Sequence, residues 1–279
     1  MAGRLEGKVV FITGVARGQG RSHAVRFAEE GADVIGIDIC EQIDSVGYPL
    51  STKADLDETV KLVEALDRRI VVGQADVRDR ESMRTVLEEG MATLGRLDFV
   101  LANAGIMPIW GERSQTMQAW QDALDVLLTG VLNTVELTYP HLIEQGRGGS
   151  IVITSSMAGV EKPMMRTETN HTLGMLGYTT AKSALKSLMR NYASFLASHS
   201  IRVNSVHPTG VNTPMVQNDM MATYFTESTP EDLLTLVNAL PVDAVEPVDI
   251  SNMMVFLCSD EARYFTGNVV RVDAGADLR

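Results

Sequence analysis

The chain has 279 residues, of which 45% are hydrophobic and 22% charged, and its formal net charge is −12. This length can bury a large core and fits one sizeable α/β domain. The acidic balance, without a basic stripe, argues against a nucleic-acid partner, and anionic membranes would repel such a chain. The sequence contains no apolar run long enough to span a membrane, no signal peptide and no metal-ligand spacing, and its two cysteines lie far apart. We therefore expect a cytoplasmic protein with no metal site and no membrane partner.

Apolar, β-rich runs alternate with amphipathic runs along the chain. A helix is expected over Gly20–Ala32, and Thr52 with Asp55 forms a capping-box pattern at the start of another. Strands separated by helices form βαβ units. We predict a single-domain Rossmann fold over residues 1–279, a doubly wound parallel sheet of about seven strands with helices on both faces and ligands at the carboxyl ends of the strands. The expected strands are Lys8–Gly14, Asp33–Cys40, Ile70–Val77, Leu97–Gly105, Ser150–Ser156, Ile201–Pro208 and Asn268–Gly275.

Two long connections interrupt the alternation. One is an insert at about residues 41–55, directly after the second strand, and the other is Met157–Gly177. Loops of this length in a compact domain are usually functional or mobile. The insert could fold over a bound ligand, or it could be a surface loop without such a contact.

The stretch TGVARGQG places Gly14, Gly18 and Gly20 between a strand and a helix. Such glycines permit a tight turn and let a pyrophosphate approach a helix N-terminus, although an ordinary glycine-rich turn has the same composition. Asp38 ends the second strand, where a carboxylate can accept hydrogen bonds from the adenosine ribose and repel a 2′-phosphate, which favours NAD over NADP. Alternatively, Asp38 is a solvated strand-end residue. Arg17 in the turn could contact a phosphate.

The stretch YTTAK places Tyr178 and Lys182 one helical turn apart. An ammonium near a phenol favours the phenolate, so we expect Lys182 to lower the pKa of Tyr178, which could then act as a base on an alcohol. Ser156, at the end of the fifth strand, could hold the substrate oxygen. Without further motifs, a plain amphipathic helix surface would be the better explanation of this pair.

Further motifs are present. The turn Thr13–Gly20, ANAG (Ala102–Gly105), SSMAG (Ser155–Gly159), YTTAK and HPTGVNTPM (His207–Met215) resemble, in order and spacing, those of the short-chain dehydrogenases/reductases. The resemblance covers nearly the whole chain and implies catalysis by Ser156, Tyr178 and Lys182, a substrate-covering segment at about 212–245, and a homotetramer. It implies that the cofactor contacts Gly14, Arg17, Gly18, Gln19, Gly20, Asp38, Ile39, Asp76, Val77, Asn103, Ala104, Gly105, Thr154, Tyr178, Lys182, Pro208, Val211 and Thr213.

The chain departs from this family at one position. A typical DVNLTG pattern reads DVLLTG here, with Leu127 in place of an asparagine that helps to hold a proton-relaying water. Asn133 lies six residues later and is a poor substitute. We interpret Leu127 as a change in proton relay, and a NAD-binding protein without catalysis remains an alternative.

The insert and its flanks most resemble a narrower group, the mycofactocin-coupled, carveol-dehydrogenase-like enzymes of actinobacteria. This resemblance implies a NAD bound so tightly that it does not exchange, with mycofactocin as external electron acceptor. An ordinary carbonyl reductase with exchangeable NAD(H) remains open. Apolar residues that could wall a pocket for a terpenoid- or steroid-like secondary alcohol are Met107, Ile109, Trp110, Met164, Met165, Met175, Met215, Met220 and Met221. His171 and His207 are interpreted as a solvated and a structural histidine.

Overall fold

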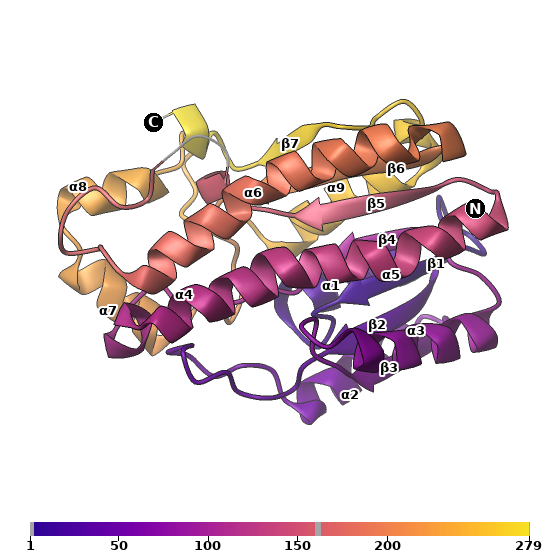
Figure 1. Cartoon of the computed structure of the whole chain (residues 1–279), viewed down its shortest axis with the longest axis horizontal. Coiled ribbons are helices and arrows are strands. Elements are labelled where there is room, and N and C mark those ends of the chain that lie inside the picture. The colour runs from indigo at the N-terminus through magenta and orange to yellow at the C-terminus, as the bar shows by residue number, and fades with distance from the viewer. Residues whose placement is uncertain (1–2, 160–162, 279) are drawn as a thin grey trace.

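The computed structural model describes residues 3–159 and 163–278. One parallel sheet of seven strands runs through its centre, with the strand order β3-β2-β1-β4-β5-β6-β7 (Figure 1). The predicted doubly wound sheet is confirmed, and every strand lies within its expected range to a residue or so. The strands are β1 (Val9–Thr13), β2 (Asp33–Asp38), β3 (Ile70–Gln74), β4 (Phe99–Ala102), β5 (Gly149–Thr154), β6 (Ile201–Pro208) and β7 (Val269–Val272).

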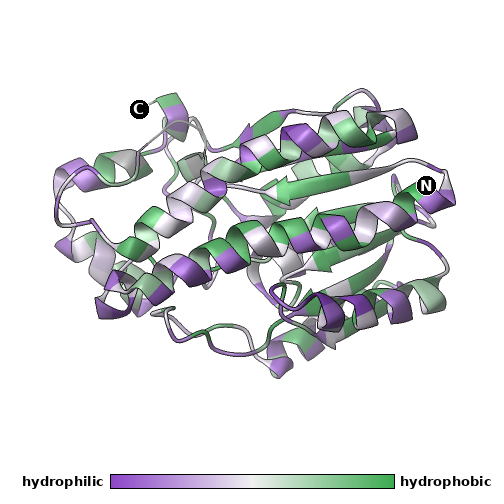
Figure 2. Cartoon of the chain, in the orientation of Figure 1, coloured by the Kyte–Doolittle hydropathy of each residue, from purple (hydrophilic) through white to green (hydrophobic). Residues whose placement is uncertain are grey.

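Helices cover both faces of the sheet. Alternation along β1 sends Val9 and Phe11 to the face packed by α3, α5 and α6, and Val10 and Ile12 to the face packed by α1, α2 and α9. The helices are α1 (Gly18–Glu29), α2 (Lys53–Glu64), α3 (Arg80–Leu94), α4 (Met117–Leu124), α5 (Gly130–Gln145), α6 (Leu173–Leu196), α7 (Asp219–Glu227), α8 (Pro230–Leu233) and α9 (Pro247–Cys258). Hydropathy follows the same plan, with the strands mostly hydrophobic and the outer turns of the helices hydrophilic (Figure 2).

Local capping fixes where the functional helices begin. The predicted capping box of α2 is confirmed, because the Asp55 amide donates to Thr52 Oγ1 at 3.2 Å and the Thr52 amide to Asp55 at 2.8 Å. Thr172 caps α6 by accepting from the Met175 amide at 2.9 Å, and its hydroxyl donates to the Ile109 carbonyl at 3.1 Å. The start of α6 is thereby tied to the loop after β4, which sets the position of Tyr178 relative to the sheet.

Within the described part of the chain, no helix is long and apolar enough to cross a membrane. The connection predicted at Met157–Gly177 is shorter than expected, because the Thr172 cap starts α6 at Leu173 and the last five residues of the predicted range are helical. Residues 160–162 of this range lie outside the described part of the chain. The short helices α7 and α8 lie outside the layers that cover the sheet, beside the first turns of α6 (Figure 1).

Candidate cofactor cleft and active site

The glycine-rich turn after β1 has the shape of a phosphate cradle. Gly14 and Gly18 adopt φ of +72° and +58°, which favours glycine. A Cβ on Gly20 would clash with the Gly14 carbonyl oxygen, and one on Gly14 would lie 2.8 Å from the Ala104 Cα. No described side chain caps α1, so its first amides can donate to an anion. These observations fit a dinucleotide diphosphate at this turn.

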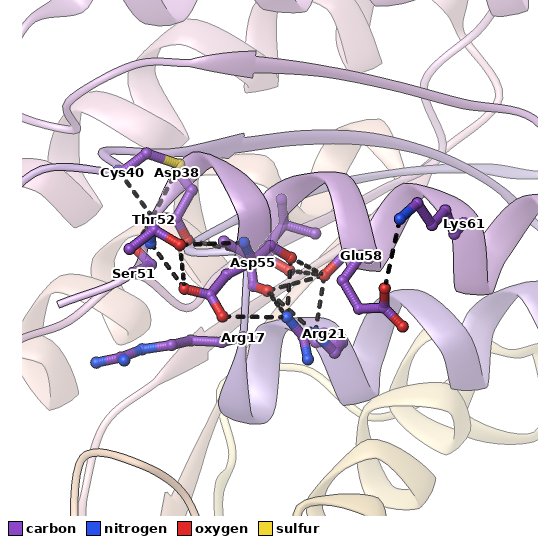
Figure 3. Close-up of polar contacts among 12 residues, drawn as sticks. Arg17, Arg21, Asp38, Cys40, Ser51, Thr52, Asp55, Glu58 and Lys61 are labelled. Atoms are coloured by element: carbon purple, nitrogen blue, oxygen red, sulfur yellow. Dashed lines mark hydrogen bonds and ion pairs between the residues drawn. The ribbon is translucent and has the colours of Figure 1, made fainter.

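Asp38 lies buried at the end of β2, as predicted, and its carboxylate is held by protein donors. One oxygen accepts from the Ala16 amide at 2.9 Å, and the other accepts from Ser51 Oγ at 2.5 Å and from the Cys40 amide at 3.2 Å (Figure 3). The Cys40 thiol also contacts the second oxygen at 4.0 Å. Among the described residues, the first oxygen accepts only from Ala16 and keeps an acceptor site for a ribose hydroxyl. The fixed orientation places a negative charge where a 2′-phosphate would be repelled.

The cleft beside Asp38 brings together most of the predicted cofactor residues. A second cavity adjoins the cleft, and its lining includes Tyr178, Pro208 and Val211 of the predicted set. Two members of the set, Thr154 and Lys182, line neither space. The residues of the predicted set that line the cleft are Gly14, Arg17, Gly18, Gln19, Gly20, Asp38, Ile39, Asp76, Val77, Asn103, Ala104, Gly105 and Thr213.

Gln19 and Thr213 line both the cleft and the neighbouring cavity. The Oε1 atom of Gln19 is buried and makes no hydrogen bond within the described chain. A buried polar atom without a partner is uncommon in folded proteins, and a cofactor bound here could supply the missing donor. The position of Gln19 between the cleft and the cavity therefore also fits a cofactor that passes from one to the other.

The insert after β2 forms part of the cleft. Gln42 organises it by donating to the carbonyls of Ile43, Val46 and Tyr48 at 3.1–3.2 Å. Its residues Ile43, Tyr48, Leu50 and Ser51 line the cleft, and none of the four was among the predicted site residues. Their place directly after the ribose-side carboxylate was the only signal in the sequence.

Four contacts tie the insert to the walls of the cleft. Arg17 donates to the Pro49 carbonyl at 2.5 Å, and Ser51 donates to Asp38. The Met107 amide donates to the buried Tyr48 hydroxyl at 3.1 Å, and Ser45 donates to Asp122 of α4 at 2.7 Å. The insert is therefore a strap between the phosphate turn, the loop after β4 and α4.

Asn133 has a role that the sequence did not reveal. Its amide donates to the Val77 carbonyl at 2.9 Å from the interior of α5. Arg78 pairs with Asp76 at 2.7 Å and with the buried Asp122 at 3.3 Å. These contacts fix the turn carrying Asp76 and Val77, which forms the predicted adenine side of the cleft.

Ser156, Tyr178 and Lys182 come together where the cleft meets the cavity. The hydroxyls of Ser156 and Tyr178 interact, and both residues line the cavity. Lys182 Nζ is buried, donates to the Thr154 carbonyl at 2.8 Å and lies 6.0 Å from the centre of the Tyr178 ring. The phenol can therefore exchange a proton with a ligand oxygen that Ser156 also contacts.

We expected Lys182 to lower the pKa of Tyr178, and this expectation is wrong. Burial raises the pKa of Tyr178, and the Ser156 hydroxyl only partly opposes the rise. Burial also lowers the pKa of Lys182 to about 8, because a dry environment disfavours its charge. The ammonium is turned toward the Thr154 carbonyl, so its field does not outweigh the desolvation of the phenol.

His207 holds the backbone of Ser156 through a hydrogen bond, in agreement with its structural interpretation. Its Nδ1 lies 2.9 Å from the Ser156 carbonyl, which can only accept, so Nδ1 carries the proton and Nε2 accepts from Ser205 Oγ at 2.8 Å. Burial lowers the pKa of His207 to about 4, so the ring is neutral. His171 is exposed in the loop before α6.

Comparisons with known proteins agree with this geometry. A family model described as "Enoyl-(Acyl carrier protein) reductase" matches residues 14–277. A protein of Mycolicibacterium smegmatis named putative short-chain type dehydrogenase/reductase is 49% identical over 288 residues, which cover 100% of both chains. The chain belongs to the short-chain dehydrogenase/reductase family.

Two relatives within this family carry the name carveol dehydrogenase. A (-)-trans-carveol dehydrogenase of Rhodococcus erythropolis is 46% identical over 284 residues, covering 99% of each chain. The crystal structure of a carveol dehydrogenase from Mycobacterium avium in complex with NAD has a TM-score of 0.89 and 47% identity, covering 99% of this chain and 100% of that one.

The departure from the short-chain dehydrogenase/reductase pattern at Leu127 lies in a one-turn π-helix, Asp125–Thr129. Leu127 is fully buried against Ala123, Ala181 and Tyr178, and its Cδ2 would lie 3.1 Å from a Cβ on Gly105. An apolar side chain thus fills the place where the family's asparagine would assist a water.

Ser156 and Tyr178 open into a cavity of about 660 Å³. Trp110, Met165 and Met220 are absent from its lining, contrary to expectation. Trp110 packs edge-on against Tyr224 with ring centres 5.1 Å apart, and the Met220 thioether faces Gly47 of the strap. The methionines that line the cavity are Met107, Met157, Met164, Met175, Met215 and Met221, and Ile109 lies beside them.

Proposed function

We propose that this chain interconverts an apolar secondary alcohol and its ketone, with NAD as a tightly held cofactor that mycofactocin re-oxidises. The observation that carries the alcohol chemistry is that Ser156 and Tyr178 face a methionine-rich cavity at its junction with the cofactor cleft. When bound, NAD would supply a hydride acceptor at its nicotinamide ring.

In alcohol oxidation, Ser156 would hold the substrate oxygen and Tyr178 would take the hydroxyl proton as the carbinol carbon gives up a hydride. Loss of the hydroxyl proton to Tyr178 and of the hydride to the nicotinamide together leave the C=O bond of the ketone. Because burial opposes the phenolate, the ammonium of Lys182 and the positive charge of an oxidised nicotinamide would both help to stabilise it.

NAD is favoured over NADP by the fixed carboxylate of Asp38. No described residue places a cation beside that carboxylate in the cleft except Arg17, whose guanidinium donates to the Pro49 carbonyl of the strap. The NAD in the related carveol dehydrogenase structure supports the same choice.

The strap supports tight retention of the cofactor. Its Ser51 is bonded to the Asp38 carboxylate at the ribose side, and its Pro49 to Arg17 at the phosphate turn. Release of the adenosine half would require both contacts to open. Residues 41–55 are thus proposed as a cofactor-retaining insert and residues 212–245 as the substrate-covering segment of one cytoplasmic domain.

The first test measures NAD(H) bound per chain after exhaustive dialysis, followed by absorbance at 340 nm when carveol is added without free NAD. Near-stoichiometric NAD and a rise that stops after one turnover are expected. An empty protein that turns over only with added NAD would instead support an ordinary exchanging carbonyl reductase.

The Tyr178→Phe variant tests the chemistry separately from retention. We expect it to keep its NAD and to lose at least a hundredfold in single-turnover rate, in the range of a lost acid–base group. An unchanged rate would contradict the role of the phenol.

Light scattering of the purified protein tests the proposed homotetramer, for which a monomer would be the contrary result.

A further inference from the structure

We infer that the natural substrate is considerably larger than carveol, an apolar secondary alcohol with the bulk of about three fused six-membered rings. The inference rests on the proposed alcohol chemistry and adds the size class of the substrate. It is carried by the volume of the cavity, by the exposure of its outer wall and by the way its polar groups are used.

The volume sets the scale. A cavity of about 150 Å³ binds one benzene ring in a protein interior, so the space of about 660 Å³ corresponds to roughly four such rings. Gln19, Pro208, Val211 and Thr213 line the same space, and the nicotinamide would occupy that part of it. Roughly three ring equivalents remain, whereas carveol has a single ring with short side groups.

The outer wall supports the same conclusion. Around the catalytic end the lining is dry, with Met175 and Met221 exposed by only 1% and 4%. Side chains elsewhere in the same lining are open to solvent, including Val237 at 44% and Leu240 at 61%. A one-ring ligand held at Tyr178 would leave such apolar surface in water, whereas a longer one would cover it.

Apart from the Tyr224 hydroxyl, which is buried and has no hydrogen-bond partner in the described chain, few polar side chains of the lining are available to bind a second polar group of the substrate. Asn238 lines the cavity, but its amide donates to the Val242 and Asp243 carbonyls and accepts from Thr209, so it holds a turn together. The lining methionines are flexible and polarisable and can adapt to a bulky ring system. The substrate is therefore apolar along most of its length, and besides the reacting hydroxyl it has at most one further polar group, placed at the Tyr224 hydroxyl.

The experiment compares NAD-loaded protein with alcohols of increasing size in single turnovers at 340 nm. The probes are carveol, the isomeric 2-decalols, and androstanols with the hydroxyl at position 3 or 17, with 2-tetradecanol as an open-chain probe. We expect the best androstanol to have an apparent second-order rate constant at least tenfold above that of carveol. A 2-tetradecanol rate above that of the androstanols would overturn the fused-ring form of the inference.

Binding of the matching ketones provides a second readout that does not depend on turnover. The dissociation constant, measured by calorimetry, should fall at least tenfold from carvone to the better of androstan-3-one and androstan-17-one. Leu236→Trp, which fills part of the cavity, should lower the androstanol-to-carveol rate ratio at least tenfold.

Two failures are distinguishable. Equal or better rates and affinities for carveol and carvone would overturn the size inference and leave the proposed alcohol chemistry in place. If no probe reduces the bound NAD, or if Tyr178→Phe reacts as fast as the parent, the proposed function itself fails.

Discussion

Two buried histidines should make the stability of this protein fall as the solution becomes acidic. His23 of α1 is fully buried, with Nδ1 2.8 Å from Ser251 Oγ, and burial lowers its pKa to about 3. His207 is also fully buried, and its pKa is lowered to about 4. In the unfolded chain both would titrate near 6.5.

The sign and size of the effect follow from these values. Above about pH 6.5 both states are neutral at these positions, and the histidines add no pH dependence. Below about pH 6.5, the two histidines are protonated in the unfolded chain but stay neutral in the folded chain. The free energy of unfolding therefore falls with pH until the folded pKa is reached. At pH 5 each histidine lowers the free energy of unfolding by about 2 kcal/mol. This value is about 1.36 kcal/mol per pH unit multiplied by the roughly 1.5 units between the unfolded pKa and pH 5.

The assay is urea unfolding of the parent and of His23→Gln between pH 8 and pH 5, followed by fluorescence after refolding has been verified. The stability difference between parent and variant should change by about 2 kcal/mol, which is about 0.7 M urea for an m of about 3 kcal/mol/M. His199→Gln at an exposed position is the matched control and should show a constant difference. A constant difference for His23→Gln as well would refute the reasoning.

Three further predictions concern the cleft. Gln19→Met should raise the stability of the ligand-free protein by about 1 kcal/mol, because it removes a buried amide oxygen that has no hydrogen-bond partner in the described chain. The variant should also show a smaller NAD-induced shift in Tm, and a lower ligand-free Tm would contradict this. Gly20→Ala should cost about 1–3 kcal/mol and abolish NAD retention, since its Cβ would clash with the Gly14 carbonyl; normal NAD content would be the contrary result. Asn133→Leu should weaken NAD binding about tenfold by freeing the Val77 carbonyl, measured by calorimetry, and unchanged affinity would argue that this turn is held by other contacts.

The order and type of the elements were predictable from the sequence because they depend on near neighbours. The periods of apolar residues separate strands from helices, and the capping box at Thr52 lies within four residues of chain. The glycine turn and the Tyr178–Lys182 spacing are likewise local patterns. Parallel βαβ connections then bring Asp38, Asn103 and Ser156 to the same edge of the sheet.

Tertiary packing alone decided how the side chains at this edge act. No local pattern shows that Lys182 turns to the Thr154 carbonyl, that His207 holds Ser156, or that Asn133 reaches Val77 across 56 residues. The pKa of Tyr178 was predicted in the wrong direction because spacing shows which charge is near, whereas desolvation depends on every atom packed around the group. The sequence by itself determined which groups meet in the site, and the folded structure decided their orientation, their charge and the strap that crosses the cleft, since these depend on contacts between residues distant in the chain.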